Sequence, residues 1–175
     1  MTSRTMYAEN DRMANQVAEM AKSACAELFG AYGVKLSAEP GPWATTDTRL
    51  YSGVMGFVGS NIRGTCLLVG EPAPLEATCP KEGRLRDWVG ELANQLVGRL
   101  KLKLLSRGVA VTLTTPVVFT GVRVEPLPRS TLLPHVFSSP HGGVLVWLEV
   151  ESAAGLALGS ERPNQAGAEG DILLF

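Results

Sequence analysis

Few cysteines occur in this sequence, and their number and spacing argue against folds that depend on disulfides or on cysteine-bound zinc. Cys25, Cys66 and Cys79 are an odd number, and no two of them form a C-x-x-C pair. A disulfide framework and a cysteine-rich zinc site are therefore disfavoured. Reduced thiols are typical of the cytosol, so we expect a cytoplasmic protein.

Long apolar runs and an excess of charge are also missing. No stretch approaches about 18 consecutive apolar residues, and the amino-terminal residues hold no apolar run of signal-peptide length, so we expect no membrane span and no signal peptide. The formal net charge is −1, without a long basic run, which argues against nucleic acid as the main partner. What is present is an ordinary globular composition, 45% hydrophobic and 19% charged in 175 residues, which suffices for a sizeable core.

The pattern of one long amphipathic helix runs from residue 84 to residue 107. At about 100° per residue, its apolar side chains gather on one side of the helix. They are Leu85, Trp88, Val89, Leu92, Leu96 and Leu100. Gly108 follows as the predicted end of the helix. The apolar side predicts contact with a hydrophobic core.

The opposite side of this helix is unusual, because it carries two acids, an amide and a glycine. Its members, spaced four, three and four residues apart, are Asp87, Glu91, Asn94 and Gly98. Asp87 and Glu91 are like charges one turn apart, which costs a few tenths of a kcal/mol. Gly90 and Gly98 each cost about 1 kcal/mol relative to alanine in a helix interior. A face so poorly suited to helix stability predicts that another molecule docks on it.

A second long helix is predicted near the amino terminus. Either Asn10 or Asp11 can cap it, and the helix is expected to run to Phe29. Its apolar stripe consists of Met13, Val17, Met20, Ala24 and Leu28.

Apolar and β-branched runs between glycines and prolines predict the strands. From Thr45 onward, two strands are expected to form a hairpin with its turn near residues 59–61. Pro116 marks a break between two further strands. Further strands are expected at 109–115, 117–124, 144–150 and 153–158, a loop or edge segment at 34–43, a short helix at 72–79 and a loop at 125–134. This leaves His135 and His141 in proline-rich loops.

Two short matches within the chain suggest an internal duplication. Residues 14–17 (ANQV) match residues 93–96 (ANQL) at an offset of 79, and GVMGFV at 53 is weakly echoed by GVLVWL at 143. A duplicated helix-plus-strands unit would explain both, and chance similarity is the alternative. In the first copy Arg12 stands where the long helix has Glu91, so a second site there is not expected.

The outer helix face resembles the signature of the CheC/CheX/FliY phosphatases of bacterial chemotaxis. Their pattern is an acid or serine, then Glu, then Asn on one helix, with a proline at a downstream strand. Asp87, Glu91, Asn94 and Pro116 stand in this order here. The glycine-rich residues 53–64 (GVMGFVGSNIRG) also resemble the hairpin of CheX-type members, and a single Glu-x-x-Asn helix indicates the CheX-like branch.

The resemblance implies a fold and a reaction. The fold would be α+β and CheC-like, with two long helices packed on a largely antiparallel β-sheet. Residues 1–159 would form the phosphatase domain, and residues 160–175 a flexible tail. The reaction would be hydrolysis of the phospho-aspartate of a CheY-type response regulator. Asn94 would orient the attacking water, and Glu91 would pair with a lysine of the regulator.

The resemblance also implies what each partner contributes. Asp87, Gly90 and Gly98 would contact the regulator, which supplies the Mg²⁺, so this chain needs no cofactor and no metal ligand of its own. Exposed edge strands further predict a homodimer.

Two alternatives stay open at this point. The first is a non-enzymatic adaptor that binds a signalling partner through the same helix face or through the apolar tail residues 172–175, which otherwise tuck onto the domain. The second is a component of a flagellar-switch-like assembly.

Overall fold

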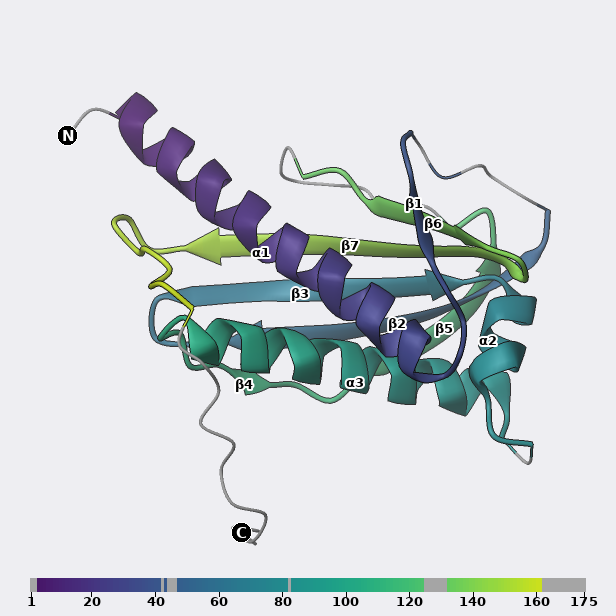
Figure 1. Cartoon of the computed structure of the whole chain (residues 1–175). Coiled ribbons are helices and arrows are strands. Elements are labelled where there is room, and N and C mark those ends of the chain that lie inside the picture. The colour runs from purple at the N-terminus through teal and green to yellow at the C-terminus, as the bar shows by residue number, and fades with distance from the viewer. Residues whose placement is uncertain (1–2, 42, 44–46, 82, 125–131, 162–175) are drawn as a thin grey trace, which may run out of the picture.

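The computed structural model describes residues 3–41, 43, 47–81, 83–124 and 132–161, with side chains from residue 12 onward. Helices lie across one face of a single sheet (Figure 1). The elements are α1 (Ser3–Ala31), β1 (Ser37–Glu39), β2 (Arg49–Val58), β3 (Ile62–Gly70), α2 (Pro72–Thr78), α3 (Leu85–Ser106), β4 (Thr112–Leu113), β5 (Val117–Val122), β6 (His135–Ser139) and β7 (Gly142–Ser152). None of these helices combines the length and the apolar character that crossing a membrane requires.

All paired strands of the sheet are antiparallel, in the order β1-β6-β7-β3-β2-β4, and β5 also pairs with β2. Strand β4 pairs with the end of β2 at Phe57 and Val58, whereas β5 pairs with residues 49–54. β4 and β5 therefore form one interrupted edge. Pro116 lies in the interruption, where its missing N–H removes a ladder hydrogen bond, so the predicted break is confirmed.

The larger part of the core lies between the helices and the sheet. The predicted stripe of α1 is confirmed, since Met13, Val17, Ala24 and Leu28 are buried and Met20 packs against them. A smaller apolar cluster covers the other face of the sheet and consists of Leu50, Leu67, Val69 and Leu145, with Trp43, Val54, Val124, Val136 and Trp147 around them. Both faces of the central strands are thus removed from water.

The sheet order supports the predicted duplication. Since β5 shares the edge with β4, the order can also be written β1-β6-β7-β3-β2-β5. If β1, β2 and β3 are exchanged with β5, β6 and β7 respectively, the result is the same order read from the opposite edge. The offset of 79 residues also carries α1 onto α3, β1 onto β5 and β3 onto β7. The weaker echo was misassigned, because GVMGFV lies in β2 and GVLVWL lies in β7, which is the counterpart of β3.

Several elements differ from the predictions. The strand expected at 109–115 is reduced to β4, Thr112–Leu113, and the strand expected at 117–124 ends at Val122. Helix α1 begins at Ser3 rather than at Asn10 or Asp11, because no proline or glycine interrupts the residues before them and a capping residue can also lie inside a helix. Residues 135–139 form β6 rather than a loop, since β6 pairs with both β1 and β7. Residues 153–158 turn back onto the core through Leu156 and Leu158 instead of forming a strand.

Some predictions lie outside the described residues. They are most of the loop expected at 125–134 and the tail beyond Glu161, including residues 172–175. The short helix at 72–79, the hairpin turn at 59–61 and the edge segment at 34–43 are confirmed by α2, by the β2–β3 connection and by β1.

Candidate functional site

Helix α3 presents the candidate site, and its position on the sheet is fixed by close packing. A Cβ added to Gly53 of β2 would lie 2.7 Å from Ala93 Cβ and 2.9 Å from the carbonyl oxygen of Val89. The glycine therefore lets the helix backbone approach the strand. Gly108, with a φ of +82°, ends the helix, and the Val109 N–H donates to the carbonyl of Leu104 at 3.0 Å.

The outer face of α3 contains most of the predicted residues. Asp87, Glu91 and Asn94 are exposed. Gly98 is partly buried, but a Cβ there would meet nothing within 4 Å. These four residues, which we call the α3 outer face, lie together as the helical spacing predicts.

Gly90 does not belong to this face. It is buried, and a Cβ at this position would lie 2.9 Å from Val118 Cγ2 of β5. The absence of a side chain at Gly90 is therefore explained by packing inside the molecule. The prediction that Gly90 contacts a partner is wrong, because α3 turns this position toward the edge strand.

The polar groups of the α3 outer face are open to a partner. Asp87 and Glu91 form no ion pair with any residue in the described ranges. The side chain of Asn94 makes no hydrogen bond to another described residue. Asp87 and Asn94 can therefore engage a partner without first breaking an internal contact, and Glu91 has no ion pair that an incoming cation would have to displace.

Glu91 is held by residues that sequence reasoning missed. Gln95 Nε2 donates a hydrogen bond to Glu91 Oε1 at 2.9 Å. Tyr32, just beyond α1, donates from its hydroxyl to Gln95 Oε1 at 3.0 Å. The i, i+4 spacing of Glu91 and Gln95 is a readable signal, whereas Tyr32 is 63 residues from Gln95 and leaves no local signal.

The proline of the signature lies beside the strand that borders α3. Pro116 directly precedes β5, which contacts α3 through Val118 and Gly90. The preceding turn is fixed by Thr114 Oγ1, which accepts a hydrogen bond from the Gly56 N–H at 2.9 Å. Helix, glycine hairpin and proline therefore meet at one edge of the fold.

The histidines and cysteines form no alternative catalytic group. His135 lies half-buried against α1, with its Nε2 atom 4.0 Å from Glu19 Oε1, and burial lowers its pKa although the Glu19 carboxylate opposes this. Burial raises the pKa of the Cys66 thiol to about 12 and that of Cys25 well above its usual value. All three cysteines are free thiols. Within the described ranges, no cluster of three or more His, Cys, Asp or Glu side chains could hold a metal ion.

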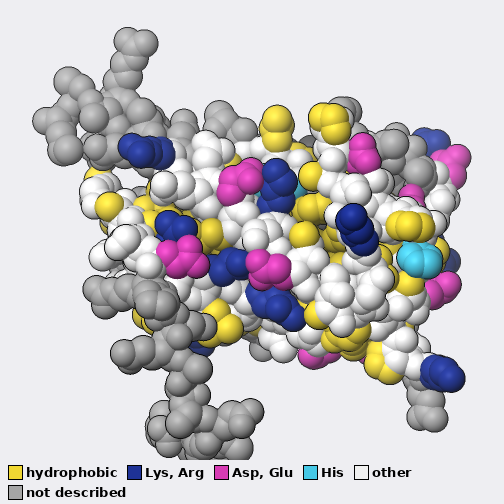
Figure 2. Space-filling view, in the orientation of Figure 1, with side chains coloured by type: hydrophobic (Ala, Val, Ile, Leu, Met, Phe, Trp, Pro, Cys, Tyr) yellow, Lys and Arg dark blue, Asp and Glu magenta, His cyan; other side chains and the backbone are white. Residues whose placement is uncertain are grey.

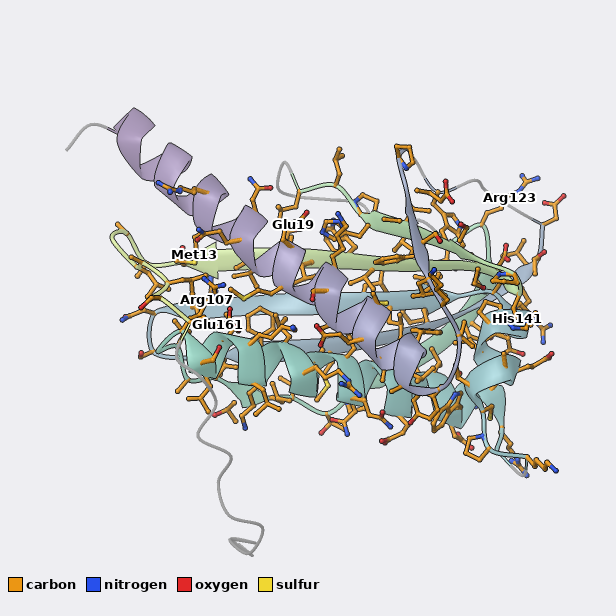
Figure 3. The ribbon with its side chains drawn as sticks, in the orientation of Figure 1. Met13, Glu19, Arg107, Arg123, His141 and Glu161 are labelled. Carbon is orange, nitrogen blue, oxygen red and sulfur yellow. The ribbon has the colours of Figure 1, made fainter. Side chains whose placement is uncertain are left out.

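The face of α1 that corresponds to the candidate site has different chemistry. Arg12 and Asn15, the counterparts of Glu91 and Asn94, line an open hollow of about 950 Å³ between α1 and the end of α3. Arg107 and Glu161 lie together at its rim and form an ion pair at 3.4 Å (Figure 3). Across the face that α1 and α3 share, basic and acidic side chains are interspersed rather than gathered by sign (Figure 2).

Comparison with known proteins identifies solved structures that share the fold of this chain. No protein-family model matches the sequence, and no curated protein matches it. Solved structures do match. CheX from Vibrio vulnificus superposes with a TM-score of 0.65 at 21% identity, over 77% of this chain and 96% of that one. The chain has the fold of the CheC/CheX/FliY proteins.

Two further structures agree with this assignment. A CheC-like superfamily protein from Shewanella sp. PV-4 has a TM-score of 0.62 at 20% identity, over 78% of this chain and 97% of its own. CheX from Borrelia burgdorferi, in a complex with CheY, BeF3 and Mg²⁺, has a TM-score of 0.53 at 15% identity, over 77% and 97%. The predicted α+β fold, with long helices on an antiparallel sheet, is confirmed.

Proposed function

We propose that this protein is a cytoplasmic phosphatase that hydrolyses the phospho-aspartate of a CheY-type receiver domain. One observation carries the proposal: Glu91 and Asn94 lie exposed, one turn apart, on a helix fixed to the sheet. Support comes from the CheX fold, one example of which was solved in complex with CheY.

Asn94 is proposed to orient the attacking water. Its carboxamide offers both a donor and an acceptor, and no described residue engages it. Phosphoryl transfer depends mainly on positioning and on charge stabilisation. A side chain that holds one water in line with the phosphorus atom therefore suffices, without a nucleophile from this chain.

Glu91 is proposed to pair with a lysine of the receiver domain and thereby to set the docking register. Asp87 adds negative charge one turn away, which favours a basic partner and speeds its encounter. Gly98 leaves room for the partner to approach the helix. The receiver domain would bring its own Mg²⁺, and this chain would need no cofactor.

A homodimer is also proposed, through the edge of the sheet. Strand β5 exposes Val117, Phe119 and Val122, of which Val117 is 63% exposed. An apolar edge strand with unpaired backbone groups favours pairing with a second copy.

The adaptor alternative has one observation in its favour. Beyond Gly98, the exposed side of α3 continues with Leu102 and Leu105, which are 54% and 52% exposed. Apolar surface next to polar groups suits a stable complex without chemistry.

The lifetime of the phosphoryl group separates phosphatase from adaptor. A phosphorylated receiver domain with Mg²⁺ is mixed with this protein, and both binding and phosphate release are followed. The phosphatase proposal predicts faster release that saturates with binding. Saturable binding without any change in lifetime would instead establish the adaptor.

A further inference from the structure

We propose that Tyr32 and Gln95 are positioning residues that fix the carboxylate of Glu91 for docking of the phosphorylated receiver domain. The inference rests on the proposed function, because it assigns a role within the same site. It concerns two side chains that do not touch the reacting atoms.

The positioning begins with a directed chain of hydrogen bonds. The Tyr32 hydroxyl donates to Gln95 Oε1 at 3.0 Å, and Gln95 Nε2 donates to Glu91 Oε1 at 2.9 Å. Every donor in the chain points toward the carboxylate. The amide of Gln95 is thereby kept in the orientation that presents its N–H, rather than its oxygen, to Glu91.

Tyr32 can anchor this chain because its own place is fixed. The carbonyl of Phe29 accepts backbone hydrogen bonds from the N–H groups of Tyr32 and Val34, both at 3.0 Å. Gly33 supplies the φ of +81° that ends α1 and turns the chain. The tyrosine ring is thus directed across to α3.

The ring of Tyr32 is also held by an aromatic contact. It packs edge-to-face with Trp88 of α3, with ring centroids 5.4 Å apart and planes at 87°. Trp88 Nε1 donates to Thr78 Oγ1 of α2 at 2.9 Å, and the buried Thr78 donates to the carbonyl of Leu75 at 2.9 Å. Tyr32 is therefore held by α3 through Trp88, and Trp88 is itself held by α2.

The consequence for Glu91 is preorganisation. An exposed glutamate samples several rotamers, and this freedom is lost when it pairs with a partner. The hydrogen bond from Gln95 selects one rotamer beforehand and engages one oxygen, which leaves Oε2 for an incoming ammonium group. Preorganisation of this kind strengthens binding by reducing what must be ordered on association.

A purely structural role for the same contacts makes a different prediction. If Tyr32 and Gln95 only fasten the end of α1 to α3, their loss should lower the midpoint of thermal unfolding and act independently of Glu91. If they position Glu91, their loss should weaken docking only while Glu91 is present. The two effects are separable by conservative variants.

The test uses Tyr32→Phe, which removes the hydroxyl and keeps the ring, and Gln95→Met, which keeps the length of the side chain and removes the amide without adding a charge. Binding is measured against a receiver domain held in its activated form by beryllofluoride and Mg²⁺, and kcat and KM against the phosphorylated receiver. Each variant should raise Kd and KM by roughly five- to tenfold, the loss expected for one typical hydrogen bond. Unfolding midpoints and kcat should stay close to wild type.

Two controls make the test specific. Ser23→Ala removes a comparable i, i+4 hydrogen bond, from Ser23 Oγ to Glu27 Oε1 at 2.8 Å on α1, and should leave Kd unchanged. In a Glu91→Gln background, Tyr32→Phe should weaken binding no further, because coupled residues are non-additive.

Failure of the inference and failure of the proposed function give different results. Suppose that the wild type hydrolyses phospho-aspartate and that Glu91→Gln weakens docking. If Tyr32→Phe and Gln95→Met then bind like wild type, or act additively with Glu91→Gln, only the positioning role is overturned. If the wild type neither binds nor hydrolyses, the proposed function is overturned together with this inference.

Discussion

Single residues on α3 have roles that depend on which neighbour they face. Gly90 and Gly98 share one helix, yet Gly90 is buried under Val118 and Gly98 has open space beside it. A missing side chain at Gly90 serves internal packing, whereas at Gly98 the internal structure gives no reason for glycine. Gly98 therefore remains the glycine of the candidate docking face.

The two glycines predict opposite effects on stability. Gly98→Ala should raise the free energy of unfolding by about 0.5–1 kcal/mol, the usual gain of alanine over glycine in a helix. Gly90→Ala should be less stable than Gly98→Ala by about 1–3 kcal/mol, since its Cβ would press on Val118. Urea denaturation of both variants measures the difference, and equal stabilities would refute the packing account of Gly90.

His135 predicts an acid-sensitive component of stability. Because burial lowers its pKa in the folded state, the unfolded chain takes up the proton first as the pH falls below about 6.5. The full stability is therefore present above that pH and decreases below it. Glu19 and Lys22 of α1 face the ring, with opposing effects on its pKa.

The variant His135→Gln should flatten the pH dependence of the free energy of unfolding between about pH 7 and pH 5. His141→Gln, in the exposed β6–β7 turn, serves as the control for the substitution itself. An unchanged slope in His135→Gln would exclude this histidine as its source.

At the scale of elements, the candidate site depends on how α3 sits on β2. The helix backbone touches the strand at Gly53, where the nearest atoms are Ala93 Cβ and the carbonyl oxygen of Val89. A backbone oxygen cannot rotate away, so a larger residue at 53 must move the helix. Residues that never contact the partner therefore set the geometry of Glu91 and Asn94.

Gly53→Ala should lower the free energy of unfolding by about 1–3 kcal/mol, because it overpacks a tight contact. Displacement of α3 should also reduce phosphate release. Gly56→Ala is the matched milder variant, because the atoms nearest its Cβ would be those of the Thr114 side chain at 3.1 Å and 3.3 Å, and the nearest backbone oxygen, that of Gly64, would lie at 3.6 Å. If Gly53→Ala is as stable as Gly56→Ala, the tight contact does not hold α3 in place.

Elements with strong local patterns were predictable from the sequence, and elements defined by pairing were not. Helix α3 begins and ends within one residue of its predicted bounds, because its apolar period and Gly108 are local signals. Strand β6 is short and flanked by prolines, and only its pairing with β1 and β7 defines it. Likewise, helical spacing predicted that one face is shared by Asp87, Glu91, Asn94 and Gly98, whereas no sequence pattern indicated that Tyr32 reaches this face.

For the whole molecule, the sheet order relates two halves that no longer carry the same chemistry. The half that contains α3 keeps the glutamate and asparagine, and α1 has Arg12 and Asn15 at the matching positions. The same architecture leaves β5 as an apolar edge. One candidate site and one candidate dimer surface thus lie on the second half.

The dimer proposal predicts a loss of association when the β5 edge is charged. Phe119→Lys and Val117→Lys should each shift the mass in solution from two chains to one, because a lysine on an edge strand opposes pairing. Analytical ultracentrifugation measures the mass. A wild-type protein that sediments as a single chain would contradict the proposal.

The most direct test of the central claim compares two asparagines at matching positions of the two helices. Phosphate release from a phosphorylated CheY-type receiver domain is measured under saturating binding for the wild type, Asn94→Ala and Asn15→Ala. We predict that Asn94→Ala lowers the rate roughly a hundredfold, because the attacking water loses its orientation, and that Asn15→Ala matches the wild type. A wild-type rate for Asn94→Ala, or an equal loss in both variants, would contradict a phosphatase site on α3.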